Sequence, residues 1–139
     1  MRKLRNSELN RVSTEEFKQI DKLPIIVALN DGRSMHNVGS VFRTCDAFKI
    51  ERLILGGITP IPPLAEIEKT ALGATESVDW VYEKDFAKAI LALKTYGYKI
   101  IAFEHTSESV SIIDYEFLKE KCVIIFGNEV KGISSEVLA

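Results

Sequence analysis

Short apolar runs rich in isoleucine and valine alternate along the chain with segments of helical period. The clearest runs cover residues 25–29, 52–55, 98–103 and 122–126, and a weaker one covers 79–82. Alternation of this kind is typical of an α/β domain in which a mostly parallel sheet is flanked by helices. The pattern therefore predicts a single α/β fold built on these strands.

Apolar residues at helical spacing predict the two longest helices. One is expected to begin near Asn37 and carries an apolar face made of Val38, Val41, Phe42, Cys45 and Phe48. The other should begin after Asp85, a good N-cap residue, and stop at Gly97. Its apolar face consists of Phe86, Ala89, Ile90 and Leu93.

Three shorter helices are expected. One lies around residues 63–71, one follows Asp114, and one follows Ser13, which has the spacing of a capping box with Glu16. Residues 134–139 resemble a helix that has just begun, and a helix of barely one turn is unstable alone. We therefore expect the domain to be incomplete at its C-terminal end.

The length and charge of the chain narrow the choice of fold and partner. Its 139 residues suit one domain, and 18 basic against 20 acidic residues leave no overall basic field for nucleic acid. Residues 1–11 are the exception, with four basic residues against one acidic residue. Such an arm either meets phosphates or is simply solvated. We expect a short basic extension with a helix at 1–23 and the main domain at 24–139.

Membrane and metal functions are disfavoured by what the sequence lacks. No apolar run approaches the roughly 18 residues of a membrane span, and no signal peptide precedes the domain, so we expect a cytoplasmic protein without a membrane partner. Cys45 and Cys122 lie in apolar segments and should be buried. Together with His36 and His105 they show no metal-ligand spacing, so no metal is expected.

The first loop that suggests chemistry covers residues 30–39 and leads to Arg43. It leaves the C-terminal end of a predicted parallel strand, where open α/β sheets bind their ligands. Asn37 is a suitable helix cap, Gly39 allows a backbone or a ligand to come close, and Arg43 lies near the same helix face. The same residues also suit a capped surface helix with a solvated arginine.

The second loop covers residues 126–134 and also follows a predicted strand. Gly127 and Gly132 have the spacing of a phosphate-binding P-loop, but Ile133 stands where that motif needs lysine. Nucleotide hydrolysis is therefore disfavoured, and an ordinary nucleotide-binding domain becomes a weaker alternative. Glycines on both sides of Glu129 suggest a tight loop that approaches a neutral or cationic ligand, or a plain strand-to-helix turn.

Taken together, these segments resemble the SpoU/TrmH branch of the SPOUT RNA methyltransferases. Residues 37–44 (NVGSVFRT) look like the first family motif, N-x-G-x-x-x-R, and residues 125–134 (IFGNEVKGIS) look like the second, FGNE-x-x-G-[IL]-S. Residues 72–74 (LGA) resemble an intervening element, and the likeness spans residues 24–139. Two ordered motifs are more specific than either alone.

Two departures from the family pattern stand out. Lys49 occupies a position that is usually glycine, which affects a turn. The third family motif, Ser-Leu-Asn-x-Ser, completes a deep trefoil knot and the cofactor pocket, and it has no counterpart before Ala139. We therefore expect a SPOUT-type fold whose knot segment is missing from this sequence.

The resemblance implies methyl transfer from S-adenosylmethionine to a ribose 2'-hydroxyl of tRNA or rRNA by a homodimer. It makes Arg43 the catalytic arginine, supported by Asn37 and Glu129. The residues that it places at the cofactor are Phe103, Glu104, Gly127 and Ile133. Because a guanidinium rarely gives up its proton, Arg43 suits a clamp on the phosphate and the 2'-oxygen better than a general base. The alternative is a non-catalytic RNA-binding or scaffold protein of the same fold.

Overall fold

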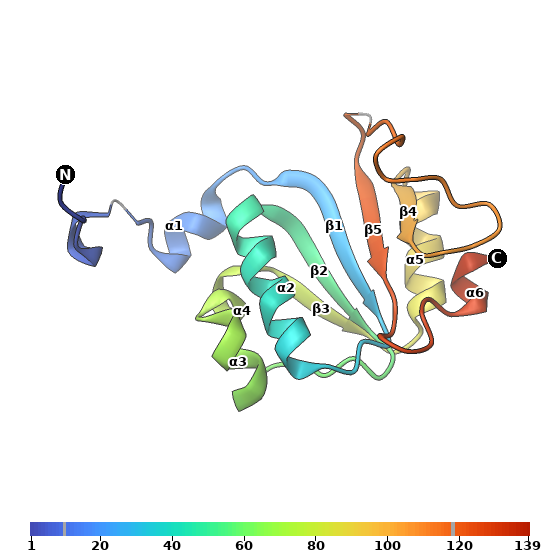
Figure 1. Cartoon of the computed structure of the whole chain (residues 1–139), viewed down its shortest axis with the longest axis horizontal. Coiled ribbons are helices and arrows are strands. Elements are labelled where there is room, and N and C mark those ends of the chain that lie inside the picture. Colours follow the sequence, from blue (N-terminus) through green and yellow to red (C-terminus); the bar gives the residue numbers. More distant parts are fainter. Residues whose placement is uncertain (10, 118) are drawn as a thin grey trace.

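The computed structural model describes residues 1–9, 11–117 and 119–139. A five-stranded sheet in the order β3-β2-β1-β5-β4 forms its centre, and every neighbouring pair is parallel (Figure 1). The strands are β1 (Leu23–Asn30), β2 (Ile50–Gly56), β3 (Trp80–Glu83), β4 (Lys99–Phe103) and β5 (Cys122–Phe126). The predicted α/β fold with a parallel sheet is confirmed, and each predicted apolar run lies on a strand.

Helices cover both faces of the sheet (Figure 1). They are η1 (Asn6–Glu8), α1 (Thr14–Gln19), α2 (Met35–Phe48), α3 (Ala65–Ala71), α4 (Ala74–Ser77), α5 (Phe86–Thr95) and α6 (Ser135–Leu138). Helices α2, α3 and α4 share one apolar core with alternate residues of β1 and β2. Helices α5 and α6 share a second core with the intervening residues and with β5.

The central strands are buried on both faces, which explains why they read as continuous apolar runs rather than alternating ones. In β1, Val27 and Leu29 face the α2 layer, whereas Ile26 and Ala28 face the α5 layer. Cys45 and Cys122 are both buried, as predicted. Burial raises the pKa of the Cys45 thiol to about 12, so this side chain acts as a small apolar residue.

Helix α5 begins and ends at the residues that the sequence indicates. The carboxylate of Asp85 accepts a hydrogen bond from the Lys88 amide at 3.2 Å, and Gly97 adopts the positive φ that stops the helix. The capping box of Ser13 and Glu16 is present at the start of α1. Both predicted caps are confirmed.

The predicted cap of α2 is wrong, although the helix begins only two residues before the predicted start near Asn37. The helix begins at Met35, and Ser34 rather than Asn37 is its cap, because the Ser34 hydroxyl accepts a hydrogen bond from the Asn37 amide at 3.1 Å. Serine and asparagine are similar N-cap residues, so the sequence alone does not decide between them. Asn37 lies in the first turn, and its side chain is left available for another contact.

The helix predicted after Asp114 is also wrong for the described residues. Residues 115–117 and 119–121 are not helical, and residue 118 lies outside the described residues. The rings of Tyr115 and Phe117 pack edge to face at 4.8 Å between a turn and β5. So short a connection cannot repay the cost of nucleating a helix. The helices expected around 63–71 and after Ser134 are present as α3 and α6.

In the described part of the chain, no helix combines the length and the apolar composition needed to cross a membrane.

Candidate active site

Five loops gather at the carboxyl edge of the sheet, because parallel strands all end at the same edge (Figure 1). They cover residues 31–34, 57–64, 84–85, 104–113 and 127–134. Strand β1 lies between β2 and β5, which come from distant parts of the chain. The two loops that carry the motifs, 31–34 and 127–134, therefore meet although almost a hundred residues separate them.

The 127–134 loop folds back on itself immediately after β5. The backbones of Asn128 and Gly132 exchange two hydrogen bonds of 3.0 and 2.9 Å. Gly127 packs so closely on this return that a Cβ atom there would collide with the backbone of Gly132 and Ile133. A glycine is thus required at position 127 by a close approach of two backbones.

The side chain of Asn128 fixes the loop and joins it to the first loop. Its Oδ1 accepts hydrogen bonds from the amides of Val130 and Lys131 at 2.8 and 2.9 Å. Its Nδ2 donates to the Asp31 carbonyl at 2.7 Å. Asn128 is only 8% exposed, and it is not among the site residues predicted from the sequence, although it lies inside the second motif.

Glu129 joins the two loops from the other side. Its carboxylate accepts hydrogen bonds from the amides of Arg33 and Ser34 at 2.9 and 3.0 Å. The Arg33 amide is the main reason that the pKa of Glu129 lies below its ordinary value, and the Ser34 amide and the Asn37 side chain lower this pKa further. The structure therefore brings Glu129 and Asn37 together, with a negative charge at the start of α2, where the helix dipole favours it.

The lowered pKa of Glu129 predicts a pH-dependent contribution to stability. Because the folded-state pKa is below that of the unfolded chain, the contribution is fully present above the ordinary glutamate pKa and is lost as the pH falls through the folded-state value. Urea denaturation should therefore show Glu129→Gln less stable than wild type at neutral pH, with the difference shrinking in acid. The exposed carboxylate of Glu116 offers a control, and Glu116→Gln should match wild type throughout. A Glu129 difference that is independent of pH would contradict this account.

Glu104 holds the other side of the 127–134 loop. Its two carboxylate oxygens accept hydrogen bonds from the amides of Ile133 at 2.7 Å and His105 at 3.0 Å. These amides, that of Ile133 foremost, lower the pKa of Glu104, so the carboxylate is ionised at neutral pH. Gly132 has a positive φ, and a Cβ there would collide with the Glu104 carboxylate.

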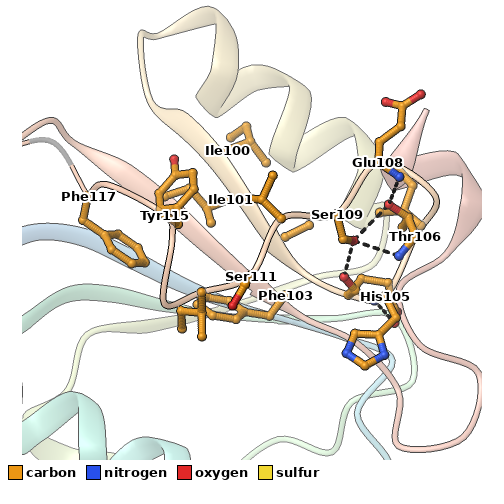
Figure 2. A pocket seen from close by; sticks show the side chains of 15 residues that line it. Ile100, Ile101, Phe103, His105, Thr106, Glu108, Ser109, Ser111, Tyr115 and Phe117 are labelled. Carbon is orange, nitrogen blue, oxygen red and sulfur yellow. Dashed lines mark hydrogen bonds between the residues drawn. The ribbon is translucent and has the colours of Figure 1, made fainter.

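Phe103 lies beside this contact, at the end of β4. Its ring stacks on that of Phe126 at 5.0 Å, and Phe126 is 40% exposed at the end of β5. A cavity of about 970 Å³ opens between β4 and the loop that follows it, with Phe103, Glu104 and Tyr115 in its lining (Figure 2). Ile133 is only 4% exposed, with its side chain in the α5 core. The predicted cofactor residues thus lie close together. Ile133 belongs to this group through its backbone, because its side chain is buried.

Arg43 lies apart from this cluster. It is exposed on α2, and no hydrogen bond or ion pair joins it to another of the described residues. It follows Asn37 by six residues, which places it roughly 9 Å farther along the helix and on a different side. The structure therefore does not bring Arg43 to the contact between Asn37 and Glu129. Gly39 allows α2 to pack closely against the backbone of α3. A Cβ atom at position 39 would collide with the Ile67 carbonyl.

Two further buried polar residues support the loops and were missed in the sequence. The Asn30 side chain accepts a hydrogen bond from the Ser134 amide at 2.8 Å. The Thr59 hydroxyl accepts one from the Gly32 amide at 3.0 Å and donates to the Gly56 carbonyl at 2.6 Å. A polar residue at the end of an apolar strand was a signal for Asn30, whereas nothing in the pattern marks Thr59.

No group of three or more histidine, cysteine, aspartate or glutamate side chains suited to a metal ion occurs within residues 1–9, 11–117 and 119–139.

Residues 24–139 match the model of the SpoU rRNA Methylase family. The chain belongs to this family. Among similar proteins, the 23S rRNA (guanosine-2'-O-)-methyltransferase RlmB of Neisseria meningitidis serogroup B is 27% identical over 125 residues, which are 89% of this chain. The tRNA (guanosine(18)-2'-O)-methyltransferase TARBP1 of Mus musculus is 25% identical over 123 residues, or 87% of this chain. The chain spans 49% of the first relative and 8% of the second.

Solved structures agree with this assignment at the level of the fold. The A. aeolicus TrmH/SpoU tRNA modifying enzyme superposes with a TM-score of 0.75 at 22% identity, covering 90% of this chain and 64% of the other. The AdoMet-bound rRNA methyltransferase of Sinorhizobium meliloti gives a TM-score of 0.76 at 24% identity, covering 88% of this chain and 47% of the other. The parallel sheet is thus the SpoU-family fold.

Proposed function

We propose that this protein transfers a methyl group from S-adenosylmethionine to a ribose 2'-hydroxyl of tRNA or rRNA. The observation that carries the proposal is the 127–134 loop, which folds back at Gly127 and is held by Glu104 on one side and joined through Glu129 to the start of α2 on the other. Membership of the SpoU family and two relatives named as RNA 2'-O-methyltransferases support it.

The residues at the carboxyl edge suit this cofactor. Its sulfonium and ammonium groups are cationic, and the ionised carboxylate of Glu104 lies in the lining of the cavity. The ring of Phe103 offers an apolar surface for the adenine base, and the turn at Gly127 lets a ligand approach the backbone. The side chain of Ile133 is buried and holds the 127–134 loop against the core. The bound cofactor would supply a methyl group activated by the sulfonium.

The protein's own residues would bind and orient the substrate. Glu129 acts as a support rather than as a base, because both of its oxygens already accept amide hydrogen bonds and Asn37 lies beside it. The exposed guanidinium of Arg43 would hold the phosphate and stabilise the developing negative charge on the 2'-oxygen, since it presents several fixed donors. The 2'-proton would then leave to solvent or to the phosphate.

Two measurements on the protein test this proposal. Calorimetry with S-adenosylmethionine should show one site per protomer, and tritium from the labelled cofactor should enter total RNA. Absence of heat at millimolar cofactor would overturn the cofactor assignment. Cofactor binding without any incorporation into RNA would overturn the reaction, and RNA binding without cofactor binding would favour a non-catalytic RNA-binding role.

The proposal extends to the organisation and location of the protein. We assign the methyltransferase domain to residues 24–139 and a short basic extension to 1–23, in which Arg2 is already paired with Glu8 at 2.7 Å. Because its substrate would be tRNA or rRNA, we place the protein in the cytoplasm.

We also predict a homodimer. The connection between β4 and β5 exposes four large apolar side chains, Val110, Ile112, Ile113 and Phe117, and such a patch favours association. Analytical ultracentrifugation at tens of micromolar protein should give the mass of two chains, and the double variant Ile112→Ser, Ile113→Ser should shift the mass towards one chain. A wild-type monomer at this concentration would contradict the prediction.

A further inference from the structure

A surface rich in lysine and tyrosine lies at the amino ends of β4 and β5, at the edge of the sheet opposite the candidate site. We call it the lysine surface, and it consists of Lys94, Tyr96, Tyr98, Lys99, Tyr115, Lys119 and Lys121. The fold brings its parts together because the Lys99 amide donates a hydrogen bond to the Lys121 carbonyl at 3.0 Å. The last turn of α5 adds Lys94, and Gly97 lies against the Lys121 side chain.

The charge of the lysine surface is positive although the chain is acidic. Residues 94–99, 115–117 and 119–121 contain four lysines and two acidic residues, Glu116 and Glu120, whereas the whole chain has a net charge of -2. All four lysines are exposed, and none forms an ion pair with another of the described residues. A neighbouring carboxylate, Glu51, accepts a hydrogen bond from the Tyr98 hydroxyl at 2.7 Å.

Aromatic rings hold two of these lysines in place. The Lys121 ammonium lies 4.7 Å from the centre of the Tyr98 ring, and the Lys99 ammonium lies 5.5 Å from that of Tyr115. Tyr96 lies between Lys94 and Lys99 in the sequence. It is 75% exposed, so its ring is open to solvent. Ordered lysines beside an open aromatic ring are the combination with which proteins bind single-stranded nucleic acid.

The carboxyl edge, by contrast, offers little attraction for phosphates. There are three basic and five acidic residues in the loops at this edge, which cover 31–34, 57–64, 84–85, 104–113 and 127–134. An RNA that reaches the candidate site must therefore gain its electrostatic attraction elsewhere on the protein.

We propose that the lysine surface binds the phosphate backbone of the RNA substrate, with a base stacked on Tyr96. This inference rests on the proposed function, because it takes RNA as the substrate. Strand β5 separates the lysines of this surface from the candidate site by its five residues, or roughly 16 Å, and Tyr115 is the one member of the lysine surface that also lines the cavity beside β4. The lysines therefore contribute affinity for RNA and have no part in cofactor binding or in the methyl transfer itself.

The test compares two triple variants with the same change in net charge. In the first, Lys94, Lys99 and Lys121 are replaced by glutamine. In the control, glutamine replaces three exposed lysines elsewhere, Lys49, Lys84 and Lys88. Binding of a short fluorescein-labelled RNA of mixed sequence is followed by anisotropy over a range of KCl concentrations, and thermal denaturation checks that both variants are folded.

At moderate salt, we expect the first variant to bind RNA at least about tenfold more weakly than the control. The slope of log K against log [KCl] should decrease by about 2, since each phosphate contact contributes about 0.7. Tyr96→Ala should weaken binding by about tenfold without changing the slope, because stacking carries no charge. Calorimetry with S-adenosylmethionine should give the wild-type result for both triple variants.

Equal affinity and equal slope for the two triple variants would overturn this inference and leave the proposed function intact. If wild-type protein does not bind RNA at all, both fail. Wild-type RNA binding by the first variant, combined with loss of binding to phosphatidylserine-containing vesicles, would assign the lysine surface to a membrane instead.

Discussion

Replacement of Arg43 by alanine should lower the rate of methyl transfer by roughly 100-fold or more, the scale seen when a fixed donor to a developing negative charge is removed. The fold should be unaffected, because Arg43 is exposed and such changes usually alter stability by less than about 0.5 kcal/mol. Binding of S-adenosylmethionine should also persist, since no hydrogen bond or ion pair among the described residues joins Arg43 to the proposed cofactor residues. Tritium incorporation into total RNA, calorimetry and thermal denaturation measure these three quantities.

The conservative variant Arg43→Lys serves as the matched control for charge. Lysine keeps the positive charge but not the planar set of donors, so we expect it to restore only part of the activity. Near-wild-type incorporation by Arg43→Ala would remove Arg43 from the mechanism and leave it as a solvated helix residue. Full activity of Arg43→Lys would show that charge alone is sufficient.

Replacement of Gly127 by alanine should have the second large effect. The added Cβ would collide with backbone atoms of Gly132 and Ile133, which cannot rotate away as a side chain can. The 127–134 loop must then open, which disturbs the hydrogen bond from the Ile133 amide to Glu104. We expect a loss of about 1–3 kcal/mol in the free energy of unfolding. Cofactor binding should fall below detection, because the loop forms one side of the proposed pocket.

Gly32 provides a matched control at the same edge of the sheet. A Cβ at this position would lie 3.8 Å from the nearest atom, in Thr59, which is an ordinary contact. Gly32→Ala should therefore change the free energy of unfolding by less than about 0.5 kcal/mol and leave cofactor binding intact. Urea denaturation and calorimetry on both variants decide the matter. Equal behaviour of the two variants would contradict the role assigned to Gly127.

The strands could be predicted because a parallel sheet buried on both faces requires continuous apolar segments. The runs at 25–29 and 122–126 lie within β1 and β5, and Asp85 marks the start of α5. Boundaries set by competing local contacts could not be predicted in the same way. Ser34 and Asn37 are both good caps, and the packing of Tyr115 against Phe117 replaces a helix that their local sequence allows.

The candidate site could be predicted only in part, for a similar reason. The motifs identify Glu129 and Gly127, yet their partners depend on how β1 and β5 pair in space. The contact of Asn128 with the Asp31 carbonyl joins residues 97 positions apart, and that of Asn30 with the Ser134 amide joins residues 104 apart. No local pattern of hydrophobic and polar positions contains this information, which arises only from the register of the sheet.

The most direct test of the central claim is the position of the transferred methyl group. The protein is incubated with tritiated S-adenosylmethionine and total RNA, and the RNA is digested to nucleosides that are separated by chromatography. The account predicts that the label co-migrates with a 2'-O-methylnucleoside and that its rate of incorporation falls roughly 100-fold or more when Arg43→Ala replaces the wild-type protein. Label on a base rather than on the ribose would contradict it.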